Sequence, residues 1–210
     1  MYEEILNRDH VAMQLVEYIY SLNDFSIPQN HTFSYQHMGA ILTDTILQAG
    51  LNYRNVVEPR VQRVIRNYPD ATVTSAFLAI MISEGTYQIL DWRHPEKPRR
   101  LFELTTFLFR NGIETEADLH TWLLNDINSR SLMNINGIGP KSVDYLKNLV
   151  NISTVAIDRH IHNFVKNAGL NIDMYDDIRS IVILAASSMD LLPSKLDHAI
   201  WLYMSNGKRD

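Results

Sequence analysis

Cysteine is absent from the 210-residue sequence, and this absence removes several classes of chemistry at once. Disulfides, thiolate zinc sites, iron–sulfur clusters and cysteine nucleophiles all require that residue. Long apolar runs are also absent, because no segment approaches the roughly 18 apolar residues that a membrane-spanning helix needs. The chain begins with acidic residues, Glu3 and Glu4, where a secretory signal peptide would carry bases. We therefore expect a soluble cytoplasmic protein that makes no contact with a membrane.

Net charge and composition place only weak limits on the partner. Hydrophobic residues make up 46% of the chain and charged residues 20%, which is an ordinary globular composition. The net charge of −5 argues mildly against a nucleic-acid partner. The charge is uneven, however, with acidic segments at 1–30 and 171–190 and basic segments at 54–66 and 141–166. Two interpretations of the basic segments are therefore possible. They form either a surface that binds phosphate or, more simply, part of a solvated surface of mixed charge.

Apolar residues recur with helical spacing along nearly the whole chain. One face of the first such helix carries Ala12, Leu15, Val16 and Ile19. Further helices are expected to begin at capping residues, namely Ser34, Thr74 and Thr115. Four more helices are expected later in the chain, at about 140–150, 158–168, 174–188 and 194–205. The sequence therefore predicts an all-α protein of about ten helices, without a sheet.

One segment departs from the helical pattern: residues 134–142, which read Asn-Ile-Asn-Gly-Ile-Gly-Pro-Lys-Ser. Gly137 and Gly139 permit a tight turn, and Pro140 suits the first position of a helix. Backbone N–H groups at the start of that helix point outward at its positive end, which favours a bound phosphate. Ile138 is expected to anchor the turn in the core. A Gly-x-Gly pair alone is weak support, since most such pairs are simple turns.

Residues 134–141 resemble the hairpin of the helix-hairpin-helix DNA glycosylases, the superfamily that includes endonuclease III. In that family's pattern, Gly-aliphatic-Gly is followed by any residue and then by Lys in the lyase-competent members, and Gly137 to Lys141 match it. Asp158 follows seventeen residues later within Val-Ala-Ile-Asp-Arg-His, which resembles the family's signature around its catalytic aspartate. Two motifs in this order are a stronger indication than either one alone.

The end of the chain indicates which group of these glycosylases the sequence resembles. Residues 196–204, followed by Gly207 and Lys208, are similar to the closing helix of the small archaeal-type 8-oxoguanine DNA glycosylases. Those proteins have about this size and lack the iron–sulfur loop, which agrees with the absence of cysteine. The resemblance implies a two-lobed, all-α glycosylase fold with a helix-hairpin-helix motif and without an iron–sulfur cluster.

The resemblance also implies a division of the chain into two lobes. One lobe would be a helical barrel of residues 36–150, which ends in the helix-hairpin-helix at about 128–150. The other would join residues 1–35 to residues 151–210. A cleft between the lobes would hold the hairpin and Asp158.

The same resemblance implies that Lys141 and Asp158 are catalytic. A neutral amine on Lys141 would attack C1′ of the damaged nucleotide, displace the base and form a Schiff base, after which the 3′-phosphate is eliminated. Desolvation and the positive end of a helix would both favour the neutral amine. Asp158 is expected to cap its helix and to stabilise the cationic sugar or move protons for the lysine. The alternative for Lys141 is a surface lysine that binds a phosphate.

Three further sets of residues are candidates for contact with DNA. The hairpin residues expected to bind backbone phosphate are Gly137, Ile138, Gly139 and Ser142. The candidates to contact DNA or to fill the space of an extruded base are Asn52, Tyr53 and Arg54. The candidates for a base pocket are His160, Asp197 and Trp201, although Trp201 is as readily a core residue.

No side chains are expected to hold a metal, because His160 and His162 point to different faces of a helix. Backbone carbonyls of the hairpin are candidates for a monovalent cation, as the family resemblance implies.

The predicted function is therefore base-excision repair. The protein would remove a damaged base, preferably an oxidised purine such as 8-oxoguanine, and cut the abasic site by β-elimination. Its expected partner is double-stranded DNA with a damaged base or an abasic site, and we expect a monomer without a cofactor. One alternative is an endonuclease III-like glycosylase for oxidised pyrimidines or another modified base. The other is a non-catalytic helix-hairpin-helix protein that only binds DNA.

Overall fold

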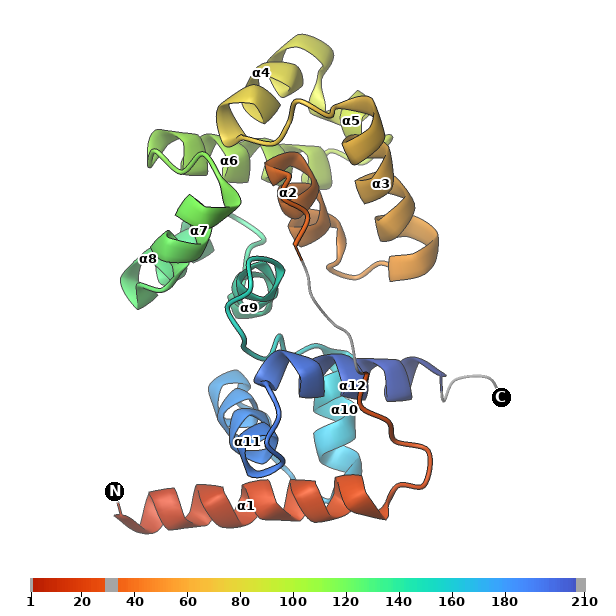
Figure 1. Ribbon diagram of the computed structural model, residues 1–210, viewed down its shortest axis with the longest axis vertical. Coiled ribbons are helices and arrows are strands. Elements are labelled where there is room, and N and C mark those ends of the chain that lie inside the picture. Colours follow the sequence, from red (N-terminus) through yellow and green to blue (C-terminus); the bar gives the residue numbers. More distant parts are fainter. Residues whose placement is uncertain (1, 29–33, 207–210) are drawn as a thin grey trace. The chain divides into compact units, whose positions relative to one another are not determined.

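The computed structural model describes residues 2–28 and 34–206, and within them every regular element is a helix (Figure 1). Twelve α-helices, one π-helical segment and one short 3₁₀ helix occur in these ranges, and no strand does. The prediction of an all-α protein is confirmed. In the same ranges, no helix is both long and apolar enough to cross a membrane.

The chain divides into two compact units, each with its own hydrophobic core. The middle unit comprises Phe33–Ile152, and the end unit joins Met1–Thr32 to Ser153–Asp210.

The middle unit is built around α2 (Met38–Leu47), whose ten residues are all buried. Such a helix, buried on all sides, is stable only when other helices surround it. Its neighbours include α3, α4, α6 and α9. The remaining elements of this unit are η1 (Tyr53–Val57), α3 (Glu58–Asn67), α4 (Thr74–Glu84), α5 (Thr86–Leu90), α6 (Glu96–Arg110), α7 (Glu116–Leu123), α8 (Asp126–Ser131), η2 (Leu132–Asn134) and α9 (Pro140–Leu149).

The end unit contains α1 (Tyr2–Ser21), α10 (Arg159–Asn167), α11 (Tyr175–Ser188) and α12 (Pro193–Asn206). Helix α1 packs against α11, and the predicted apolar face of α1 is buried. Phe164 of α10 is fully buried and packs against the rings of Tyr18, Phe25 and Tyr203. Aromatic contacts therefore connect three helices and the segment after α1 around one ring.

Two of the three predicted helix caps are wrong, and tertiary contacts explain why. Thr115 does cap α7, in a complete capping box with Asp118. Ser34 instead donates a hydrogen bond to Glu116, and α2 begins four residues later with the ring of His37 as its cap. Thr74 is the first residue inside α4, and its hydroxyl lies 3.3 Å from the Glu114 carbonyl oxygen. Each hydroxyl therefore bonds to a segment that is distant in the sequence and does not cap a helix.

Candidate active site

The glycine-containing turn lies between η2 and α9, as predicted. The N–H of Ile138 donates to the carbonyl of Ile135 at 3.0 Å, and both side chains are buried. Gly137 inside this turn has a φ of +89°, which L side chains rarely adopt. Gly139 is the N-cap of α9, and Pro140 is its first residue. Helices α8 and α9 and this turn therefore form the expected helix-hairpin-helix, anchored by Ile138.

A guanidinium from a different helix packs directly on the turn. A Cβ atom built on Gly137 would collide with the guanidinium of Arg100 in α6. Arg100 also donates to Glu96 at 3.1 Å, while its buried Nε has no hydrogen-bond partner among the described residues. Gly137 is therefore required for two reasons, its left-handed backbone and the close approach of Arg100.

Two backbone donors of the turn remain open to a ligand. The N–H groups of Gly137 and Gly139 make no hydrogen bond within the part of the chain that the structure describes. Ser142, by contrast, is buried, and its N–H donates to the carbonyl of Gly139 at 3.0 Å. Of the residues expected to bind phosphate, the two glycines therefore offer the open donors.

The side chain of Lys141, the second residue of α9, lies against the end of α2. Its Nζ donates to Oε1 of Gln48, which is buried at the C-cap of α2. The same Nζ lies 6.0 Å from the ring centroid of Tyr145, one turn further along α9. The amine is half-buried and is held by a neutral acceptor.

One turn before Gln48, α2 carries a fully buried carboxyl group, that of Asp44. Three hydroxyls donate to it: those of Tyr35 at 2.8 Å, Tyr53 at 3.2 Å and Tyr145 at 3.0 Å. Burial raises the pKa of Asp44 to about 6, although the three tyrosine hydrogen bonds act in the opposite direction. Through these hydrogen bonds, the Asp44 carboxyl group holds three tyrosines from different segments of the chain against one point of α2.

A second lysine reaches the same end of α2 from the first turn of α6. Nζ of Lys97 donates to the carbonyls of Ile46 at 2.6 Å and Ala49 at 2.9 Å. Burial, and then the positive charges of Arg100 and Lys141, lower the pKa of Lys97 to about 8.

The predicted DNA-contacting segment 52–54 is partly engaged within the middle unit. Asn52 caps η1 by accepting the N–H of Asn55 at 2.9 Å. The hydroxyl of Tyr53 donates to Asp44, whereas the side chain of Arg54 is exposed. Of the three residues, Arg54 is therefore the one with a charged side chain directed to solvent.

In the end unit, the predicted helix cap at Asp158 is confirmed. Its Oδ1 accepts the N–H groups of His160 at 2.8 Å and Ile161 at 3.1 Å. Asp197 of α12 accepts the N–H of Ala156 at 2.8 Å, two residues before Asp158. Asp197 therefore fixes the backbone that leads into the cap.

The other two candidates for a base pocket are half-buried. Trp201 stacks on His198 with a centroid distance of 6.0 Å and an interplanar angle of 13°. His160 lies in the first turn of α10. Gly207 and Lys208, which carry part of the resemblance at the chain's end, lie outside the described residues.

Among the side chains that the structure describes, no group of three or more His, Asp and Glu could hold a metal ion. His162 lies 3.4 Å from Asp173, so its ring faces a carboxylate at the surface.

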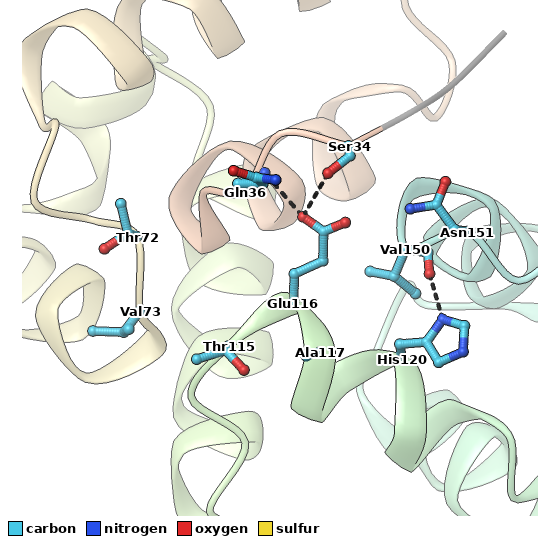
Figure 2. A pocket seen from close by; sticks show the side chains of 10 residues that line it. All are labelled: Ser34, Gln36, Thr72, Val73, Thr115, Glu116, Ala117, His120, Val150 and Asn151. Atoms are coloured by element: carbon cyan, nitrogen blue, oxygen red, sulfur yellow. Dashed lines mark hydrogen bonds between the residues drawn. The ribbon is translucent and has the colours of Figure 1, made fainter.

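The middle unit also has a polar hollow of about 500 Å³, but none of the predicted site residues lines it (Figure 2). Glu116 accepts hydrogen bonds there from the backbone N–H of Gln36 at 2.9 Å and from Ser34 at 3.4 Å, and His120 pairs with the carbonyl of Val150 at 2.6 Å. These polar side chains bond to protein neighbours, so the hollow does not indicate a reactive site.

Sequence reasoning missed Asp44, Gln48 and Lys97. A signal for the first two was present, because Asp44 interrupts an apolar run and Gln48 follows one turn later on the same face. No comparable signal marked Lys97, since a lysine near a helix start is usually solvated.

Comparison with known proteins gives one family and one solved structure. A family model described as "Domain of unknown function (DUF8548)" matches residues 99–205. No curated protein matches the chain. The chain is similar to the crystal structure of the H. pylori 3-methyladenine DNA glycosylase (MagIII) bound to 1,N6-ethenoadenine, with 14% identity and a TM-score of 0.58. The match covers 95% of this chain and 99% of that one. The predicted helical DNA glycosylase fold is therefore confirmed.

The close contact between Gly137 and Arg100 predicts that Gly137→Ala destabilises the hairpin. The left-handed backbone should cost about 1–2 kcal/mol, and Arg100 must also move. Urea unfolding measures this loss. Gly139→Ala is the matched control, because no atom lies within 4 Å of the added methyl group and φ is −110°. Equal losses at the two positions would contradict the account.

The buried carboxyl group predicts a pH dependence of stability. The pKa of Asp44 rises from 3.8 to about 6, so the folded protein binds this proton more tightly than the unfolded chain does. The free energy of unfolding should therefore fall by roughly 3 kcal/mol as the pH rises from about 4 to above 6.

In Asp44→Asn the free energy of unfolding should no longer fall by this amount between about pH 4 and pH 6. The substitution can also lower the free energy of unfolding equally at every pH, but that does not change the slope. Urea unfolding at a series of pH values measures the difference in slope. Asp70→Asn, at an exposed position, is the control and should keep the slope of the unsubstituted protein. A parallel pH profile for Asp44→Asn would show that the carboxyl group does not titrate in this range.

Proposed function

The chain belongs to the family described as "Domain of unknown function (DUF8548)", and we propose that it is a DNA glycosylase with abasic-site lyase activity. It would act in base-excision repair on double-stranded DNA with a damaged base or an abasic site. The observation that carries the proposal is the Lys141 amine, which lies directly after the Gly-Ile-Gly-Pro turn in a protein with a glycosylase fold.

The surroundings of Lys141 suit a nucleophilic amine. The group lies in the first turn of α9, where the positive end of the helix disfavours an ammonium ion. The side chain of Gln48, which accepts a hydrogen bond from the amine, is a neutral amide and can orient the amine. Half-burial adds a desolvation cost for the charged form.

The proposed reaction has two stages. The lone pair of Lys141 forms a bond to C1′ as the glycosidic bond breaks and the base leaves with its bonding electrons and then a proton. Opening of the sugar ring gives a protonated Schiff base. Loss of a proton from C2′ then expels the 3′-phosphate by β-elimination, and water releases Lys141.

Asp158 is the proposed group for charge stabilisation and proton transfer. Both cap hydrogen bonds use its Oδ1, and Oδ2 makes no hydrogen bond within the described residues. A carboxylate fixed in this way can face the cationic sugar or accept the proton from C2′.

The contacts with DNA are proposed to combine backbone and side-chain donors. The N–H groups of Gly137 and Gly139 would bind a phosphate at the start of α9. Arg54 would add a charged contact from η1. His160, Asp197 and Trp201 remain the candidates for a base pocket. With so few phosphate contacts, a shallow salt dependence of binding is expected.

The proposed substrate is an oxidised purine such as 8-oxoguanine, on the basis of the closing-helix resemblance. A second candidate is an alkylated or etheno-modified purine. The similarity to a 3-methyladenine glycosylase bound to 1,N6-ethenoadenine favours it. The protein is proposed to act as a monomer without a cofactor.

The lyase proposal predicts that borohydride captures the protein on a duplex with a single abasic site. Lys141→Gln should reduce capture by at least about a hundredfold, because the amine that forms the Schiff base is gone. Gel electrophoresis of the reduced complex measures it. Lys166→Gln, at an exposed position of α10, is the control and should be captured like the unsubstituted protein.

Undiminished capture of Lys141→Gln would overturn the role of Lys141. If the unsubstituted protein binds the duplex but is never captured, and releases no base from any damaged duplex, the non-catalytic DNA-binding alternative is correct.

The substrate proposal predicts selective cleavage within a panel of duplexes. Each duplex carries one lesion: 8-oxoguanine opposite cytosine, 3-methyladenine, 1,N6-ethenoadenine or an oxidised pyrimidine. Rates of base release should be highest for 8-oxoguanine. Preference for either adenine lesion would establish the second candidate, and preference for the pyrimidine would establish the endonuclease III-like alternative.

A further inference from the structure

The guanidinium of Arg100 lies against the glycine-containing turn with much of its hydrogen-bonding capacity unused. It occupies the place that a Cβ atom of Gly137 would take, so the contact depends on the missing side chain of that glycine. The side chain of Arg100 is only 24% exposed. Of its nitrogens, Nη2 alone makes a hydrogen bond within the described residues, to Glu96 at 3.1 Å.

The other two nitrogens of Arg100 have donors to offer. Nε is buried, and no partner for it occurs among the described residues. Nη1 makes no hydrogen bond in that part of the chain either, but it is not among the buried atoms and therefore contacts solvent. A guanidinium largely withdrawn from water normally keeps its donors paired, because an unpaired donor there costs free energy. These donors fit an acceptor that a ligand brings to the turn.

We propose that Arg100 binds the same DNA phosphate as the N–H groups of Gly137 and Gly139. This inference rests on the proposed function, since it adds a charged side chain to the phosphate site on the turn.

The contact between Arg100 and Gly137 brings the charged donor and the backbone donors together. The guanidinium carbon packs on Gly137, and Nη1 is bonded to that carbon. Nη1 and the Gly137 N–H can therefore reach different oxygens of one phosphate at ordinary hydrogen-bond distances of about 2.9 Å. The N–H of Gly139, at the start of α9, adds the positive end of a helix. A planar guanidinium also matches the geometry of a phosphate group better than a lysine amine does.

Glu96 holds the guanidinium in place without neutralising it fully. Its Oε2 accepts hydrogen bonds from Arg100 at 3.1 Å and from Arg99 at 3.2 Å, so one carboxylate faces two guanidinium groups. Arg99 has a second partner, Glu103, at 2.7 Å. The side chain of Glu96 is 44% exposed, so water screens its charge. Part of the positive charge of Arg100 therefore remains available to a phosphate.

Binding to a duplex that cannot react measures this contact. The duplex carries one tetrahydrofuran residue, an abasic analogue that lacks the C1′ hydroxyl and cannot form a Schiff base. Arg100→Met should lower the affinity about tenfold. It should also reduce the slope of log K against log salt concentration by about 0.9, because one phosphate contact is lost. Arg100→Lys keeps the charge and should show a smaller loss of affinity. Fluorescence anisotropy over a series of salt concentrations gives both quantities.

Arg66→Met is the matched control, because it removes the same charge from the same unit. Arg66 is exposed in the last turn of α3. Its loss should change the affinity by less than about twofold and leave the slope nearly unchanged, because solvent screens the charge.

A second pair of variants tests the competition between Glu96 and the phosphate. Glu96→Gln should raise the affinity, because the carboxylate no longer competes for Arg100. Glu103→Gln removes the same charge from the same helix but leaves Arg100 untouched, so its gain should be smaller. Thermal unfolding shows whether each variant is folded. If Arg100→Met is not folded, this pair decides, and equal gains would overturn the inference.

Neutral phosphates then locate the contact on the DNA. Each phosphate near the tetrahydrofuran residue is replaced in turn by a methylphosphonate. At one position the unsubstituted protein should lose affinity while Arg100→Met loses clearly less, because its contact with that phosphate is already weakened. The two losses should be additive at the other positions.

Equal effects of Arg100→Met and Arg66→Met, with additive losses at every phosphate, would overturn the inference while DNA binding by the unsubstituted protein leaves the proposed function standing. If the unsubstituted protein binds neither a damaged nor an abasic duplex, the proposed function is wrong, and this inference with it.

Discussion

A buried carboxyl group must be satisfied by hydrogen bonds, and the arrangement around Asp44 follows from that requirement. Its three tyrosine partners come from the segment before α2, from η1 and from α9. The bond to Tyr145 fixes the register of α9 against α2, and Lys141, one turn before Tyr145, is thereby placed beside Gln48. The position of the proposed nucleophile thus depends on a residue that would never touch DNA.

The charged groups around Asp44 do not follow the negative net charge of the chain. Asp44 is held at a pKa of about 6, and Lys97 at about 8. Both values result chiefly from burial, which disfavours either charge. Lys97 and Arg100 bring positive charge to the turn although the whole chain carries −5. The charges around the proposed nucleophile are therefore set by a few buried and half-buried groups of the middle unit and do not follow the net charge of the chain.

Local patterns in the sequence were sufficient for the helical fold class, the glycine-containing turn and the Asp158 cap. The Gly-x-Gly-Pro spacing predicts the hairpin, and an Asp before an apolar helix predicts the cap, because both depend on neighbouring residues alone. Ser34 failed as a cap because Glu116, far along the chain, binds its hydroxyl. The Asp44 cluster and Lys97 escaped prediction for the same reason. Their partners come from separate helices, and one sequence does not show which helices pack together.

The most direct test of the central claim is to locate the covalent bond itself. After borohydride reduction on an abasic duplex, the captured protein is digested and the modified peptide is identified by mass spectrometry. The account predicts that the reduced sugar is attached to Lys141. Attachment to Lys97, to the N-terminal amine or to any other lysine would contradict it.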